Sequence, residues 1–385
     1  MASSQATRPA WTELPPELIK MVSDKMIDIS DYVRLRAVCK SWRSAAPPSS
    51  FAQRIPWLLL PYNPDSGARS FFSLSTHQIY SLSSPQLRGR VTYGSSHGWL
   101  LTMDRSFSVS LLNPITNAFV RLPAITRLPD FTTFHFERHE DGEYIYRRHV
   151  GVSGKVNYDM IQHILLCSAF AAPGEGAGDC IVTVTSYLSP RFLCCRWADE
   201  AWTLVDSTLT CGIDSLTMYR DKLYLVGIDG SVVVCAMDHP RLRAELVPSL
   251  RVPGDFHYCS FGVVGGELLL VTTNCMRRVE EGGGIGEKAS MHFFKLDSDG
   301  RRMRWAKLED DGECPLLLTE NQVASAAIEC EGRYACFRAV RGEVDALHHR
   351  TEVVQMEEGR CRLLPCHWVT TTDALGPAWF TPTLS

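Results

Sequence analysis

Residues 11–46 read WTELPPELIKMVSDKMIDISDYVRLRAVCKSWRSAA. The stretch begins with a Leu-Pro pair, continues through amphipathic helical patterns and ends in Val-Cys-Lys-Ser-Trp-Arg. A segment this short lies at the limit below which a domain needs a partner or a staple to be stable. We therefore expect a small helical module whose apolar face is completed by something outside it.

The apolar residues of this stretch predict two helices. The first is expected over residues 15–26, because a proline suits the first helical turn and apolar residues recur at spacings of three and four. The second is expected over residues 31–45, where Leu35, Val38 and Trp42 share one face. Each helix is thus expected to carry an apolar stripe.

From Trp57 onward the sequence changes to short runs of Val, Ile, Leu, Phe and Tyr separated by turn residues. Asp-Gly at 229–230 and Asn-Pro at 113–114 are typical turn sequences. No strong helical pattern separates the runs, so neighbouring strands are expected to pair antiparallel. This all-β region is compatible with a sandwich, a barrel or a propeller.

A loose repeat favours the propeller among these architectures. Each unit has an apolar strand after a turn, a second strand ending in Asn or Asp, and a short segment near Leu-Pro or Trp, as in residues 97–123 and 266–310. A unit of roughly 50 residues matches a four-stranded propeller blade. The sequence predicts about six blades, and five or seven also fit the divergent units. The insertions at 130–158 and 276–290 are expected as loops.

Composition and charge exclude several partners. The chain of 385 residues has a formal net charge of −4, which gives no reason to expect nucleic acid or an anionic membrane. No apolar run approaches the length of a membrane-spanning helix, and residues 1–10 lack the apolar core of a secretory signal. We expect residues 1–10 to be disordered and the protein to be intracellular, in the cytoplasm, the nucleus or both. Buried free thiols are expected for the cysteines of the strand patterns, Cys180, Cys194, Cys235 and Cys336.

Catalytic and metal-binding patterns are weak. Asp297 and Asp299 before Trp305 match only part of the aspartate-box turn of sialidase-like propellers. The Cys-x4-Cys-His cluster at 361–367 has one pair of ligands where structural zinc typically needs two. His97 is expected at a strand end, hydrogen-bonded to a turn. We therefore expect no catalytic residue, no metal and no cofactor.

Residues 11–46 resemble an F-box, the adaptor-binding module of SCF ubiquitin ligases. The remainder resembles plant F-box proteins that carry a C-terminal propeller-type domain of unknown function. The F-box resemblance rests on Leu14-Pro15-x-Glu17-Leu18, Leu35 and Val38-Cys39-Lys40-Ser41-Trp42-Arg43. The resemblance of the remainder rests on SFFSL (70–74), GSSHGWLLTMD (94–104), LLNPITNAFVRLP (111–123) and AWFTP (378–382).

The resemblance implies a three-helix F-box over residues 11–50 and a β-propeller domain over residues 51–385. It implies a non-catalytic substrate-recognition subunit of an SCF-type E3 ubiquitin ligase, which promotes ubiquitination and degradation of an unknown client. The F-box would bind a SKP-family adaptor and, through it, a cullin, while the propeller would bind the client. Two alternatives stay open: an F-box scaffold whose client is not degraded, and a ligand- or carbohydrate-binding propeller. The expected adaptor contacts are Leu14, Pro15, Leu18, Ile19, Val22, Leu35, Val38 and Trp42.

Overall fold

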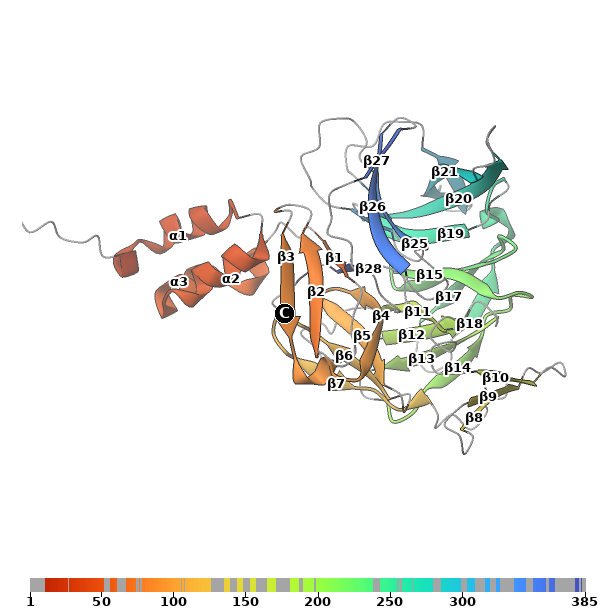
Figure 1. Ribbon diagram of the computed structural model, residues 1–385, viewed down its shortest axis with the longest axis horizontal. Coiled ribbons are helices and arrows are strands. Elements are labelled where there is room, and N and C mark those ends of the chain that lie inside the picture. The colour runs from red at the N-terminus through yellow and green to blue at the C-terminus, as the bar shows by residue number, and fades with distance from the viewer. Residues whose placement is uncertain are drawn as a thin grey trace, which may run out of the picture.

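The computed structural model describes a helical module followed by a strand domain (Figure 1). None of the helices in the described part of the chain is long and apolar enough to cross a membrane. The expected disorder of residues 1–10 falls outside that part. The described ranges are 11–26, 28–51, 56–60, 67–73, 76, 78–104, 106, 108–125, 135–138, 144–147, 153–156, 165–170, 181–186, 190–196, 199–237, 243–254, 256, 258–264, 266–279, 285–298, 303–308, 316–318, 323–325, 336–343, 349–357, 360–363, 378–380 and 382.

Three short α-helices make up the module, together with two single 3-10 turns. The first helix ends at Ser23, three residues before the predicted end, and the Asp24 N–H closes it by donating to the Lys20 carbonyl at 2.8 Å. The elements are η1 (Trp11–Glu13), α1 (Pro16–Ser23), α2 (Ile29–Ala37), α3 (Lys40–Ala45) and η2 (Pro48–Ser50).

The prediction of one helix over residues 31–45 is wrong. Cys39 adopts an extended backbone with φ −160° and ψ 175°, which no helix can continue, so α2 and α3 are separate. The second helix also begins earlier than predicted, because the Asp28 side chain accepts a hydrogen bond from the Ser30 N–H at 2.7 Å and caps α2. The three helices implied by the resemblance are present.

Four antiparallel sheets of four strands each account for much of the strand domain. One sheet is β28 (Ala378–Phe380), β1 (Trp57–Leu59), β2 (Ala68–Ser73) and β3 (Ile79–Ser83), and the next is β4 (Arg90–Ser96), β5 (Trp99–Asp104), β6 (Val109–Leu112) and β7 (Phe119–Arg121). The others are β11 (Leu165–Phe170), β12 (Ile181–Ser186), β13 (Arg191–Arg196) and β14 (Thr203–Asp206), and β15 (Ile213–Tyr219), β16 (Lys222–Gly227), β17 (Val232–Ala236) and β18 (Arg243–Leu246). The short turns η3 (Pro85–Leu87) and η6 (Pro248–Leu250) flank them.

The described residues form five blades rather than the six predicted. The last two units of the sequence repeat join into one nine-stranded sheet, because β24 and β23 pair between β19 and β25. Its strands are β19 (Tyr258–Val264), β20 (Glu267–Val279), β21 (Ile285–Ser298), β22 (Met303–Lys307), β23 (Leu316–Leu318), β24 (Val323–Ser325), β25 (Cys336–Glu343), β26 (His349–Glu357) and β27 (Arg360–Leu363).

Both insertions that were expected as loops contain strands. The hairpin of β20 and β21 extends to the pair Val279 and Ile285 and so takes in most of residues 276–290. The other insertion carries a separate three-stranded sheet of β8 (His135–Arg138), β9 (Tyr144–Arg147) and β10 (Ser153–Val156). Charged and polar residues in both stretches suggest loops, but long hairpins satisfy the backbone hydrogen bonds of such segments equally well.

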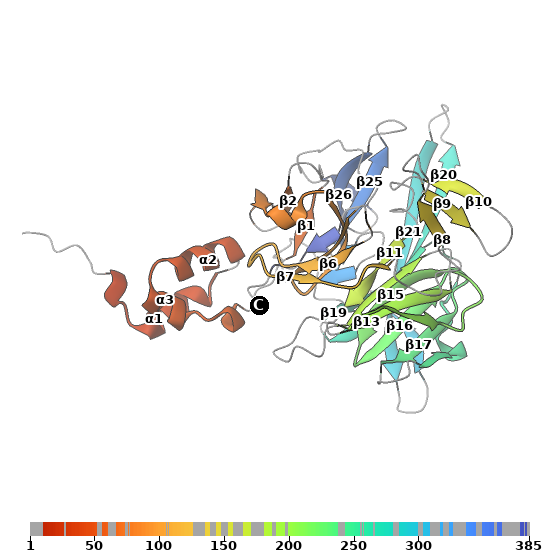
Figure 2. The ribbon, with the colours of Figure 1, turned by 90° about the horizontal axis from the view of Figure 1, so that it is seen from below.

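The first sheet combines the two ends of the strand domain. β28 pairs antiparallel with β1, placing Trp57 opposite Phe380. Phe380 and Phe71 are fully buried, and their ring centroids lie 4.9 Å apart. This pairing closes the propeller, because the last described strand completes the blade that the first strands begin (Figure 1). Figure 2 shows β1 and β2 of this blade from below.

Candidate functional site

The outer face of α1 exposes large apolar side chains. Leu18 is 47% exposed, Met21 65% and Val22 53%, while Ile19 in the same helix is buried. The helix begins with Pro16 at its first position, and the adjacent acidic Glu17 suits the positive end of the helix dipole. A short helix thus buries one side in the module and leaves an apolar side exposed among the residues that the structure describes.

Beneath this face lies the core of the module. Ile19, Ile29, Tyr32 and Leu35 are buried against one another in one hydrophobic cluster, with Leu14 and Trp42 partly buried beside them. The Trp42 Nε1–H donates to the Trp11 carbonyl at 3.1 Å, which ties α3 to the N-terminal turn. These contacts hold the three helices in a fixed arrangement.

The eight residues predicted to contact an adaptor fall into three groups. Pro15, Leu18, Val22 and Val38 are exposed, Leu14 and Trp42 are half-buried, and Ile19 and Leu35 are inside the core. Sequence reasoning omitted Met21 from the set, although Met21 lies in the same apolar stripe of α1. Trp11 was also omitted, and its position before the first helix gave no periodic signal.

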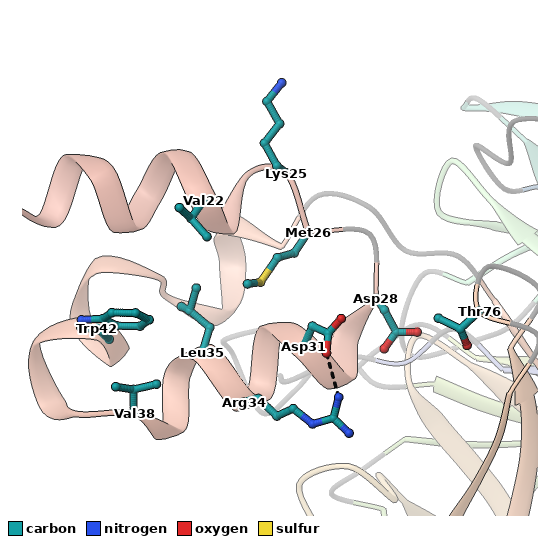
Figure 3. A pocket seen from close by; sticks show the side chains of 10 residues that line it. All are labelled: Val22, Lys25, Met26, Asp28, Asp31, Arg34, Leu35, Val38, Trp42 and Thr76. Carbon is teal, nitrogen blue, oxygen red and sulfur yellow. Dashed lines mark hydrogen bonds and ion pairs between the residues drawn. The ribbon is translucent and has the colours of Figure 1, made fainter. Parts of the chain in front are cut away.

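An open groove of about 670 Å³ runs along the module (Figure 3). At one end Val22 from α1, Leu35 from α2 and Trp42 from α3 point toward one another. At the other end polar side chains line it, close to the strand domain. The full lining is Val22, Lys25, Met26, Asp28, Asp31, Arg34, Leu35, Val38, Trp42 and Thr76.

The charges of the groove are partly compensated. The Arg34 guanidinium lies 2.8 Å from the Asp31 carboxylate, and both side chains are largely exposed. An exposed pair of this kind contributes at most about 1 kcal/mol, so it shapes the groove's surface more than its stability. What distinguishes the groove chemically is the apolar end, which can accept side chains of another protein and offers no nucleophile or acid–base pair.

Thiols in the strand domain lie in an environment that suppresses their reactivity. Burial raises the pKa of Cys194 to about 12 and that of Cys235 to about 11. Both are buried free thiols, as the strand pattern predicted. Because the thiolate is the reactive form, these cysteines are packing residues at neutral pH. Cys180 lies outside the described residues, and nothing is described of the Cys336 side chain.

One half-buried acid, Asp214, connects two sheets. The Asp214 Oδ2 accepts hydrogen bonds from the Cys259 N–H at 2.7 Å and from the Cys259 thiol at 3.1 Å, which joins β15 to β19. The Ser215 hydroxyl oxygen accepts from the Phe261 N–H at 3.1 Å in the same interface. Burial raises the pKa of Asp214, and the hydrogen bonds from Cys259 offset part of that rise.

Of the residues weighed as catalytic or metal-binding candidates, the structure describes His97 and Asp297 with other partners. His97 has a positive φ of 50° in the turn between β4 and β5, where its Nδ1 lies 2.6 Å from the Ser96 hydroxyl. Asp297 forms an ion pair with Arg304 at 2.8 Å. Cys366 and His367, which belong to the Cys-x4-Cys-His pattern weighed as a zinc site, lie outside the described residues. Within those residues, no group of three or more His, Cys, Asp or Glu could hold a metal ion.

Comparison with known proteins gives matches over both parts of the chain. The family described as F-box domain matches residues 11–51, and the KIB1-4 beta-propeller family matches residues 71–336, more than half of the chain.

Relatives with this organisation occur in Arabidopsis thaliana. F-box protein SKIP23 is 27% identical over 278 residues, covering 68% of this chain and 63% of SKIP23. F-box protein At2g26160 is 24% identical over 265 residues, covering 64% of this chain and 70% of that protein. The match to SKIP23 therefore spans less than two thirds of that relative.

Among solved structures, YjhT matches at 9% identity, covering 81% of this chain and 97% of the YjhT chain. Its TM-score of 0.36 is too low to carry any argument. The two family matches and the sequence relatives agree with the helical module and the propeller seen in the structure. The chain belongs to the plant F-box proteins that carry a KIB1-4 β-propeller.

Proposed function

We propose that this protein is the substrate-recognition subunit of an SCF-type E3 ubiquitin ligase. The observation that carries the proposal is the exposed apolar face of the F-box, by which we mean the side chains of Leu18, Met21, Val22 and Val38. Burying such a side chain against a partner stabilises a complex by about 1.5–3 kcal/mol each. A SKP-family adaptor with a complementary apolar surface is the partner that F-box proteins generally bind.

The adaptor contacts are proposed for the accessible members of the predicted set. Pro15, Leu18, Val22 and Val38 would touch the adaptor directly, and Leu14 and Trp42 through their exposed edges. Ile19 and Leu35 would support the surface from inside, because their side chains are buried in the module. Through the adaptor the F-box would join a cullin.

In this arrangement the chain itself performs no covalent chemistry. The propeller would bind a client protein and hold one of its lysines near a ubiquitin-loaded enzyme supplied by other subunits. Proximity of this kind raises the effective concentration of the reacting groups.

The experiment uses the full chain and a purified SKP-family adaptor. The double variant Val22→Asp with Val38→Asp is compared with wild type by pull-down, and then by the half-life of copurifying clients in plant cells. Losing two interface side chains costs about 2 kcal/mol or more each when they are hot spots. We therefore expect loss of adaptor and cullin from the variant and longer-lived clients. Wild-type adaptor recovery by the variant would reject the proposal. If the variant loses the adaptor but its clients have the same half-lives as with wild type, the F-box protein would instead be a non-degradative scaffold.

A further inference from the structure

The F-box and the closing blade of the propeller share one hydrophobic core. The cluster of buried residues that contains Ile29 and Tyr32 continues through Phe51 to Trp57 and Phe380. The Tyr32 hydroxyl donates to the Pro47 carbonyl at 2.8 Å, and its ring centroid lies 4.9 Å from that of Phe51. The segment that follows α3, up to Phe51, is thus anchored on α2.

Tyr80 of β3 reaches from the propeller to the first turn of α2. Its hydroxyl lies 3.4 Å from Asp28 Oδ2 and 3.5 Å from the Ser30 hydroxyl. Asp28 is buried, and its other carboxylate oxygen caps α2 through the Ser30 N–H. One carboxylate therefore both begins an F-box helix and contacts a propeller strand.

The ring of Tyr80 packs against aromatic residues of the closing blade. It stacks on Trp57 with 4.7 Å between ring centroids, and Trp57 in turn contacts Phe71 and Phe380. Phe380 belongs to β28, the strand that completes the blade from the far end of the chain. The Tyr80 hydroxyl contact with Asp28, at 3.4 Å, is long for an O–H···O hydrogen bond, so it depends on the packed ring to hold the hydroxyl in place.

We propose that Tyr80 and Asp28 form a latch that fixes the direction of the F-box relative to the propeller. Both are positioning residues, because neither belongs to the exposed apolar face of the F-box. The consequence for ubiquitin transfer rests on the proposed function: a bound client would be presented to the ligase at a constant distance and orientation. A free hinge at this point would lower the effective concentration of the client lysine.

The latch is tested on the full chain without any partner. A pair of spectroscopic labels is placed on exposed Lys20 of α1 and exposed Glu245 of β18 through unnatural amino acids, because 14 native cysteines preclude thiol labelling. The distance distribution between the labels is then measured. Wild type is expected to give a single narrow peak.

Two variants and one control decide the outcome. Tyr80→Leu keeps apolar bulk against Trp57 but cannot reach Asp28, and Asp28→Ser keeps a good helix cap but is too short to reach Tyr80. Both are expected to lose the narrow peak, whereas Tyr219→Leu, a matched change in β15, is expected to retain it. Thermal unfolding confirms that each variant is folded.

A retained narrow peak in either latch variant would overturn the proposal. The outcome is independent of the proposed ligase function, because no adaptor is present in the measurement. Adaptor binding by Tyr80→Leu is measured separately and is expected to equal that of wild type. Loss of the peak with loss of adaptor binding in that variant would show a disrupted F-box and would also reject the latch.

Discussion

Among the described residues of the F-box, within 11–46, six large apolar side chains are exposed, whereas the much longer described part of the propeller exposes five. The six are Trp11, Leu18, Met21, Val22, Val33 and Val38, and the five are Ile79, Ile228, Leu246, Val263 and Leu308. In the propeller they are isolated on different strands and turns. Isolated apolar residues are normal on protein surfaces, but several exposed on one side of a short helix, as Leu18, Met21 and Val22 are on α1, indicate an interaction site.

The difference follows from size and closure. Three helices of six to nine residues have too little interior to bury all their apolar side chains. The propeller buries its apolar residues between neighbouring sheets and joins its two ends through β28 and β1. The propeller therefore exposes only scattered apolar side chains, whereas the F-box exposes apolar side chains on one side of α1.

The largest expected effect is the loss of unfolding free energy when the buried ring of Phe380 in β28 is removed. Phe380→Ala deletes a fully buried ring from the core that both regions share. Truncation of a buried phenylalanine costs about 3–5 kcal/mol, to be measured as the free energy of unfolding in urea. Val263→Ala, at an exposed position of β19, should stay within about 0.5 kcal/mol of wild type. Equal losses for the two variants would contradict the role of β28 in closure.

Two adjacent residues of α1 differ in burial, because Ile19 lies in the F-box core and Leu18 is exposed. Ile19→Ala should lower the free energy of unfolding of the module by about 2–5 kcal/mol, because Ile19 is buried in its core. Leu18→Ala removes an exposed side chain and should change the free energy of unfolding by about 0.5 kcal/mol or less. Hydrogen exchange of the α1 backbone amides measures the local stability of the helix in each variant. Faster exchange in both would show that Leu18 also stabilises the module.

A smaller effect concerns pH and the acid between β15 and β19. Burial raises the pKa of Asp214 in the folded state, so the folded chain holds its proton in a pH range where the unfolded chain has lost it. This contribution to stability is full below the unfolded pKa and is lost as the pH rises through the folded pKa. Asp214→Asn keeps an acceptor for the Cys259 N–H and removes the titration.

Urea unfolding of wild type and Asp214→Asn across the acidic and neutral range measures this contribution. The difference in unfolding free energy should shift in favour of the asparagine variant as the pH rises. A constant difference at all pH values would show that Asp214 titrates as an ordinary exposed carboxyl.

The smallest expected effect concerns reactivity without any change in fold. Cys194 and Cys235, whose pKa values are raised to about 12 and about 11, should resist alkylation at pH 8. Cys39 of the F-box is less buried and should react faster. Peptide mapping by mass spectrometry gives the rate at each site. Comparable rates at all three positions would indicate that the buried sheets open readily.

Sequence patterns predicted much of this organisation. Leu14-Pro15 and the spacing to Trp42 located the helical module, and the Asp-Gly and Asn-Pro turns separated strands that the structure contains. His97 in its turn followed from the same pattern. These features are local, because they depend on side chains a few residues apart and on backbone preferences of single residues.

The features that sequence patterns missed depend on long-range contacts. The extended backbone at Cys39, which divides α2 from α3, has no signal in a residue type that tolerates helix and strand. The blade count differs because β23 and β24 bridge two repeat units through parallel pairs. The contact of Tyr80 with Asp28 joins residues 52 positions apart. The sequence also shows Leu18 and Ile19 simply as two apolar residues. Only the packing of the three helices determines that Ile19 is buried and Leu18 is exposed.

The central claim is that the exposed apolar face of the F-box binds the adaptor while the propeller's exposed apolar residues do not. Calorimetric titration of a purified SKP-family adaptor into Leu18→Asp and Ile228→Asp tests it directly, because the two side chains are 47% and 55% exposed. We predict loss of measurable binding for Leu18→Asp and wild-type affinity for Ile228→Asp, with both unfolding free energies within about 0.5 kcal/mol of wild type. Wild-type adaptor affinity of the Leu18→Asp variant would contradict the claim.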